Sequence, residues 1–248
     1  MKQNIKIPFV DLYSQNEELR TEIDLAIADI INRSDFITGP TVERVEKAIA
    51  EYTESEDCAS VGSGTNALVC ALRALDVGPG DEVLTVGHTF VSTTEAIVNV
   101  GAKPVFIDID EYFHFDLEQC KKFDEIYLGL NAPKAILFVD LYGQTPDIDK
   151  IKKFARKYGI KIIQDAAQSF GAKYNDKKIG SLVDLTCFSF NPVKNLGAMG
   201  DSGAVTGKKK LIDRVRMYRD HGRKTKYEYE TVGYNSRIDS LQAVVIEA

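Results

Sequence analysis

The chain has 248 residues, 44% of them hydrophobic and 27% charged, an ordinary composition for one large globular domain. A net charge of −6 and short, scattered lysine groups argue against nucleic-acid binding. No stretch approaches the ~20 apolar residues of a membrane span, the N-terminus lacks a signal-like apolar region, and the four cysteines show no CxxC spacing. We therefore expect a cytoplasmic protein with reduced thiols, no membrane partner and no metal site.

The first predicted elements lie before residue 55. An extended lead-in over 7–13 precedes an amphipathic helix over 17–33, whose apolar residues recur at helical spacing. The segment 34–40 contains Gly39 and Pro40 and ends this helix, and a second helix is predicted over 42–53. These helices form an N-terminal lead-in, about 1–55, to a single domain over 1–248.

From residue 58 onward, predicted strands and helices alternate. Strands are predicted over 58–61, 82–86, 104–109, 135–140, 161–164, 185–190 and 203–206, and helices over 65–75, 92–99, 147–158 and 208–218. The strands are nearly continuous runs of Val, Ile and Leu, a pattern typical of parallel strands buried on both faces. The predicted fold is therefore α/β, with three layers and a mostly parallel seven-stranded sheet. Only 111–132 looks irregular, and we place it at the surface.

Lys194 follows the predicted strand 185–190, on a turn that Pro192 forces because proline fixes φ and cannot donate to a ladder. Open α/β sheets bind ligands where their strands end. A lysine at that place can form an imine with an aldehyde cofactor if its surroundings keep some of it deprotonated. The alternative is a solvated surface lysine, the commoner state of this residue type.

Three more segments at strand ends carry groups that suit a single cofactor. The small-residue turn at 61–67 offers Ser63 as an N-cap and a helix terminus to an anion, although capping alone explains it equally well. Asp165 can pair with a protonated ring nitrogen, or it caps the next helix. Phe90 can stack on a planar ring, although buried packing is the commoner fate. Together with Lys194, these are the parts that a pyridoxal phosphate enzyme needs.

Six motifs occur in an order and spacing that match a known family: SGTNAL at 63–68, PGDEV at 79–83, HTF at 88–90, DAAQS at 165–169, FSFNPVK at 188–194 and GDSG at 200–203. The chain resembles the DegT/DnrJ/StrS nucleotide-sugar aminotransferases, which are fold type I pyridoxal phosphate enzymes of the aspartate aminotransferase superfamily. The resemblance implies the large cofactor-binding domain of such an enzyme, with the family's small C-terminal domain missing or truncated.

The resemblance also implies a role for each matching residue. Lys194 would bind the cofactor aldehyde and move protons, and Asp165 would keep the pyridine nitrogen protonated. Gln168 would hydrogen-bond the phenolic oxygen of the cofactor, and Phe90 would stack on its ring. Phosphate contacts would come from Ser63, Gly64, Thr65 and Ser189, and from Asn235 of the neighbouring subunit of a homodimer with a shared active site.

These roles imply a ping-pong transamination. L-Glutamate would give its amine to the cofactor, and a keto group on a nucleotide-linked hexose would receive it, for polysaccharide or deoxysugar synthesis. Dehydratases of the family carry histidine at the lysine position, so Lys194 favours transamination over dehydration. A cofactor-binding but non-catalytic regulatory or scaffold module is the other alternative. Asp140 stands where many relatives have histidine, and we expect this change to affect substrate contacts.

Overall fold

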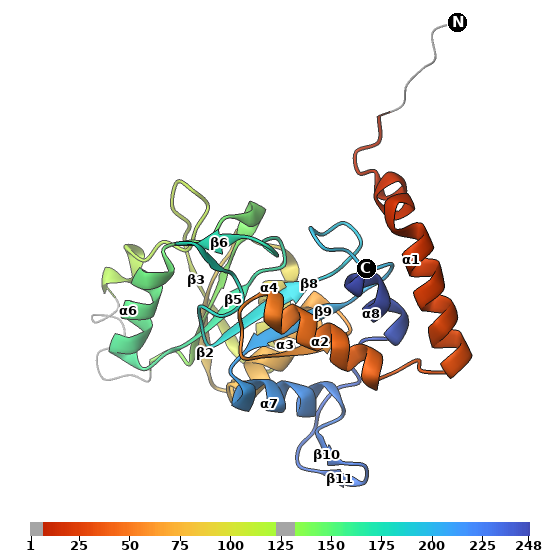
Figure 1. The fold of residues 1–248 in the computed structure, drawn as a ribbon. Coiled ribbons are helices and arrows are strands. Elements are labelled where there is room, and N and C mark those ends of the chain that lie inside the picture. The colour runs from red at the N-terminus through yellow and green to blue at the C-terminus, as the bar shows by residue number, and fades with distance from the viewer. Residues whose placement is uncertain (1–6, 123–131) are drawn as a thin grey trace, which may run out of the picture.

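Seven strands form one sheet in the computed structural model, which describes residues 7–122 and 132–248 (Figure 1). Their order across the sheet is β1-β9-β8-β5-β4-β2-β3. Their bounds are β1 Asp57–Val61, β2 Glu82–Val86, β3 Lys103–Ile107, β4 Ala135–Val139, β5 Lys161–Asp165, β8 Leu185–Ser189 and β9 Gly203–Gly207. Only β9 runs antiparallel to its neighbours β1 and β8, and the other adjacent pairs are parallel. The predicted mostly parallel sheet of seven strands is confirmed.

The strands are apolar because helices cover both faces of the sheet. All five residues of β4 are buried, and successive side chains of a strand point to opposite faces. The helices are α1 Leu12–Arg33, α2 Pro40–Tyr52, α3 Gly64–Ala74, α4 Val91–Asn99, α6 Ile148–Tyr158, α7 Lys209–Arg219 and α8 Ser240–Glu247. Helix α3 packs between α4 and α7, whereas α2 packs on α8 and on the edge strand β1. Within the described ranges, no helix is both long and apolar enough to cross a bilayer.

The N-terminal helix differs from its prediction. It begins at Leu12 rather than at residue 17, because Asp11 caps it by accepting the Ser14 N–H at 3.1 Å. The extended lead-in predicted over 7–13 is therefore wrong at its last two residues. Only Ile23 and Ile30 of this helix are buried, and Figure 1 shows α1 projecting from the body of the molecule.

Several short elements were not predicted. Two hairpins, β6 Lys173–Tyr174 with β7 Lys177–Lys178 and β10 Arg223–Thr225 with β11 Glu228–Tyr229, lie outside the main sheet. Two short 3-10 helices, η1 Gln119–Lys122 and η2 Leu141–Gly143, follow β3 and β4. Of the segment 111–132 that was predicted to be irregular, residues 123–131 lie outside the described part of the chain.

Candidate active site

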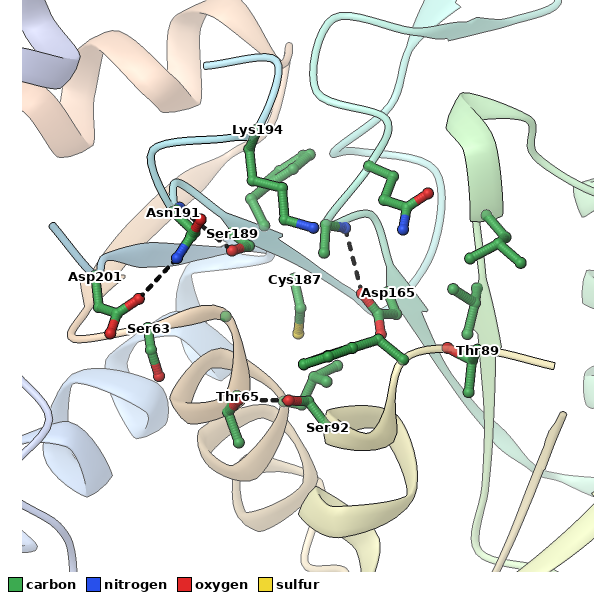
Figure 2. A pocket seen from close by; sticks show the side chains of 18 of the residues that line it. Ser63, Thr65, Thr89, Ser92, Asp165, Cys187, Ser189, Asn191, Lys194 and Asp201 are labelled. Atoms are coloured by element: carbon green, nitrogen blue, oxygen red, sulfur yellow. Dashed lines mark hydrogen bonds between the residues drawn. The ribbon is translucent and has the colours of Figure 1, made fainter. Parts of the chain in front are cut away.

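A cavity of about 350 Å³ lies where β4, β5 and β8 end, beside the N-termini of α3 and α4 (Figure 2). This volume falls in the range of small-molecule sites. The cavity is where an open α/β sheet is expected to bind its ligand. Its lining includes eight of the nine residues singled out from the sequence, namely Ser63, Gly64, Thr65, Phe90, Asp165, Gln168, Ser189 and Lys194.

Lys194 stands on a tight turn just beyond β8. The backbone N–H of Lys194 donates to the Asn191 carbonyl at 2.9 Å, and the Asn191 side-chain amide donates to Asp201 Oδ1 at 3.1 Å. The loop then folds back so closely that a Cβ on Gly197 would meet the Pro192 carbonyl oxygen at 2.6 Å, so only glycine fits there. Lys194 is half-buried, and its side chain extends over the cavity in the direction of Asp165 (Figure 2).

Asp165 is the last residue of β5, and its carboxyl is almost fully buried, with 6% of the residue exposed. Oδ2 accepts the Thr93 hydroxyl at 2.8 Å, and Oδ1 accepts the Ala167 N–H at 3.2 Å. Burial raises the pKa of this carboxyl, while the two hydrogen bonds and the charge of Lys194 act in the opposite direction. The alternative of a helix cap is wrong, because β5 leads through a turn to the hairpin β6–β7 and not to a helix.

The N-terminus of α3 lies against the end of β8 and leaves a small cradle there that is suited to an anion. Ser63 caps this helix as predicted, since its Oγ accepts the Asn66 N–H at 3.1 Å. Helix geometry leaves the N–H groups of Gly64 and Thr65 without intrahelical acceptors, and the helix dipole favours an anion there. A Cβ on Gly64 would lie 2.7 Å from Ser189 Cβ, so a side chain at this position would fill the cradle.

Gln168 and Phe90 border the same cavity with groups that remain available to a ligand. Gln168 Oε1 accepts the Tyr142 N–H at 2.7 Å, which leaves the amide N–H groups of Gln168 as donors. Phe90 precedes α4 and is 66% exposed, so the alternative of buried packing is wrong for this ring.

Asn235 does not line this cavity. It is exposed, its backbone pairs with Asp220, and its Oδ1 accepts a hydrogen bond from Arg237 at 2.9 Å. The structure therefore brings together all the predicted catalytic and cofactor-binding residues except the one expected to act on a neighbouring subunit.

Sequence reasoning missed Thr93, the donor to Asp165, and Asn191, which shapes the lysine turn. Thr93 is the residue after Ser92, which lines the cavity. The helix predicted over 92–99 therefore already placed Thr93 in the first turn, at the end of the helix that faces the cavity. Asp140, which was expected to affect substrate contacts, does not line the cavity. It is fully buried, and its Oδ2 accepts hydrogen bonds from Gln164 at 2.8 Å and from Ser169 at 2.7 Å, so it cannot contact a substrate directly.

Comparisons with known proteins agree with this geometry. The sequence model of the DegT/DnrJ/EryC1/StrS aminotransferase family matches residues 17–248. A Geobacillus stearothermophilus protein named "pleiotropic regulatory protein" is 41% identical over 98% of this chain and 64% of its own length. A UDP-N-acetyl-3-dehydro-alpha-D-glucosamine 3-aminotransferase of Acidithiobacillus ferrooxidans is 41% identical over 100% and 66%, respectively. A dTDP-3-amino-3,4,6-trideoxy-alpha-D-glucose transaminase of Streptomyces venezuelae is 41% identical over 97% and 63%.

A crystal structure of NtdA from Bacillus subtilis with bound cofactor PMP has the same fold. It is 30% identical, with a TM-score of 0.87, over 99% of this chain and 56% of that chain. The chain spans 63–66% of the length of the three relatives from Geobacillus, Acidithiobacillus and Streptomyces. The family model matches residues 17–248, and the cavity at the strand ends brings together Lys194, Asp165 and the turn at 63–65. The chain therefore belongs to the DegT/DnrJ/EryC1/StrS aminotransferase family.

Proposed function

We propose that this chain forms the cofactor-binding large domain of an aminotransferase that moves an amine from L-glutamate to a keto group of a nucleotide-linked hexose. The cofactor is pyridoxal phosphate, as the family and the PMP-bound relative indicate. The observation that carries the proposal is the convergence of Lys194, Asp165 and the α3 N-terminus on one cavity. The names of two relatives, which refer to UDP- and dTDP-linked sugars, support a nucleotide sugar as the substrate.

The cavity residues fit the cofactor at its phosphate end. The N–H groups of Gly64 and Thr65 would bind phosphate oxygens at the positive end of α3, and the Ser189 hydroxyl lies beside them. Ser63 would contribute through its place at the N-cap, which fixes the first turn of α3. The absence of a side chain on Gly64 supports this assignment, because a Cβ would occupy the space next to Ser189.

The ring end of the cofactor would meet Asp165, Gln168 and Phe90. When bound, the cofactor supplies an electron sink for the carbon that gains or loses a proton. Asp165, held by Thr93, would keep a proton on the ring nitrogen, since a carboxylate in a buried site favours a cationic partner. Gln168 would donate to the phenolic oxygen, and Phe90 would stack on the ring.

Lys194 would perform the proton transfers. Its amine extends over the cavity from a constrained turn, so it can reach a carbon bound above Asp165. When the cofactor is bound, a positioned amine of this kind would supply the nucleophile and then the general acid and base for the proton transfers. The Ala167 N–H holds the Asp165 carboxylate in place, and the Asn191 carbonyl holds the backbone of Lys194. The two side chains therefore keep a fixed position relative to each other.

We further propose a homodimer in which Asn235 reaches the phosphate of the partner's cofactor. The exposure of Asn235 and its absence from the lining of its own cavity support an action on a second copy. The proposed setting is a cytoplasmic pathway of polysaccharide or deoxysugar synthesis. Sedimentation of the wild-type chain and of Asn235→Ala, with and without pyridoxal phosphate, tests the dimer; a monomer under all conditions would contradict it.

A second candidate is a cofactor-binding regulatory module, and the name of the Geobacillus relative favours considering it. The two candidates differ in a single-turnover experiment on the full chain loaded with pyridoxal phosphate. The aminotransferase forms one equivalent of 2-oxoglutarate from L-glutamate per bound cofactor, and Lys194→Ala forms none. A wild-type chain that binds cofactor but yields no 2-oxoglutarate supports the regulatory module instead.

A further inference from the structure

Three aromatic side chains meet beside the cavity mouth, and the function proposed above gives them no role. They are His88, Phe113 and Tyr142, which we call the aromatic rim. The His88 and Phe113 rings stack with centroids 5.3 Å apart, and Phe113 meets Tyr142 edge-on at 5.8 Å. Tyr142 Oη and His88 Nε2 are 3.3 Å apart, within hydrogen-bonding distance. The rings come from three segments, which follow β2, β3 and β4.

The rim is exposed, although its rings contact one another. Phe113 is 47% and Tyr142 63% exposed, and His88 is exposed as well. Burial of apolar rings in the core therefore does not explain their gathering, because each residue keeps a large part of its surface exposed to solvent. A cluster of exposed aromatic rings at the edge of a cavity is suited to packing against a ligand.

The backbone holds two of these rings in unusual conformations. Phe113 and Tyr142 have φ values of 65° and 59°, in a region that bulky residues rarely adopt. Asp110 fixes the first through its carbonyl, which accepts the Phe113 N–H at 3.1 Å. Gln168 fixes the second by accepting the Tyr142 N–H at 2.7 Å. Strained backbone of this kind persists only where the surrounding structure holds it, as these two hydrogen bonds do here.

The rim is continuous with the cavity. Thr89 and Phe90, which follow His88, line the cavity, and so does Leu141, which precedes Tyr142. Gln168 connects the two directly, since it lines the cavity and accepts the Tyr142 N–H. The rim therefore lies next to the cavity, within reach of a ligand that is longer than the cavity is deep.

We propose that the aromatic rim is the subsite for the hexose ring of the substrate. This inference rests on the proposed function, in which the reacting carbon belongs to the sugar ring. The sugar must then lie beside the cavity, whereas the base is separated from it by the ribose and the diphosphate. A hexose presents C–H groups on its faces to aromatic rings and hydroxyls at its edge to the Tyr142–His88 pair.

Calorimetric titration of the pyridoxamine phosphate-loaded full chain with UDP-N-acetylglucosamine and with UDP tests this subsite. The first ligand carries an unreactive hexose, and the second lacks it. We expect Phe113→Ala to weaken binding of the sugar nucleotide about three- to tenfold and to leave UDP binding unchanged. Phe113→Leu should behave like the alanine variant because it also lacks the ring, and Phe113→Tyr should restore affinity. Tyr112→Ala, which removes a neighbouring ring that is 60% exposed and outside the rim, is the matched control.

Three results would overturn the subsite. If Phe113→Ala weakened the binding of both ligands equally, the base or the diphosphate would contact the rim instead of the sugar. If it left the affinity for both ligands unchanged, the rim would contact neither. A wild-type chain that binds neither ligand would also refute it. The unfolding temperature of each variant separates loss of the fold from loss of binding. Formation of 2-oxoglutarate from L-glutamate by the wild-type chain shows independently whether the proposed aminotransferase function stands.

Discussion

Asp140 makes the stability of this protein depend on pH in a direction opposite to that of most carboxylates. Its side chain is fully buried, its Oδ2 takes part in two hydrogen bonds, and its Oδ1 has no partner among the described residues. Burial raises the pKa of Asp140 from 3.8 to about 7, and the nearby Asp165 carboxyl adds to this effect. Between pH 3.8 and about pH 7, the folded protein therefore keeps a proton on Asp140 that the unfolded chain has lost.

The size of the effect follows from the two pKa values. Below pH 3.8 both states hold the proton, and between pH 3.8 and about 7 the free energy of unfolding falls as pH rises. At 1.36 kcal/mol per unit, the loss is about 4 kcal/mol in all and roughly 3 kcal/mol between pH 5 and pH 8. In Asp140→Asn, the amide oxygen can still accept from Gln164 and Ser169. Its N–H groups replace the unpartnered Oδ1 and cost about 1–3 kcal/mol at every pH.

Urea unfolding of the wild-type protein and of Asp140→Asn at intervals from pH 5 to pH 8.5 measures this difference. We expect the free energy of unfolding of the variant to gain roughly 3 kcal/mol on the wild type across that range, which offsets the cost of the amide so that the variant is at least as stable as the wild type at pH 8. Asp239→Asn, at an exposed position that makes no capping hydrogen bond, is the control and should track the wild type. Parallel curves for the wild type and Asp140→Asn would refute the reasoning, because Asp140 would then titrate alike in both states.

Two further substitutions test the cavity. Gly64→Ala puts a Cβ 2.7 Å from Ser189 Cβ, and we expect pyridoxal phosphate affinity, measured by equilibrium dialysis, to fall on the order of tenfold or more. Gly78→Ala, whose Cβ would meet no atom closer than 3.5 Å, should not change it. Thr93→Val removes the donor to Asp165 Oδ2, and we expect urea unfolding to show a loss of about 1–3 kcal/mol, which Thr93→Ser avoids. A Thr93→Val protein as stable as the wild type would mean that Asp165 finds another donor.

The sequence was sufficient for the sheet and for the groups at its strand ends, because both depend on local signals. Apolar runs marked the strands at the centre of the sheet, such as β4 with the sequence AILFV, and β2 has the predicted bounds 82–86. Pro192 marked the turn that carries Lys194, and Ser63 marked the start of α3. Since all parallel strands end on one side of a sheet, these local predictions were enough to gather most of the site.

Contacts between segments far apart in the chain could not be predicted in this way. The Thr93–Asp165 hydrogen bond joins positions 72 residues apart, and the aromatic rim combines three loops. The buried Asp140 is hydrogen-bonded by Gln164, which lies on β5, and by Ser169, which lies in the turn after β5. The hairpin β6–β7 carries mostly lysines in place of an apolar alternation, so it gave no strand signal.

The most direct test of the account is to locate the lysine that binds the cofactor. The full chain is incubated with pyridoxal phosphate, reduced with borohydride, digested and analysed by mass spectrometry. We predict one pyridoxyl group per chain, on Lys194, and its loss when L-glutamate is added before the reductant. Labelling spread over exposed lysines, or a yield unchanged in Lys194→Ala, would contradict the assignment of this cavity as an aminotransferase site.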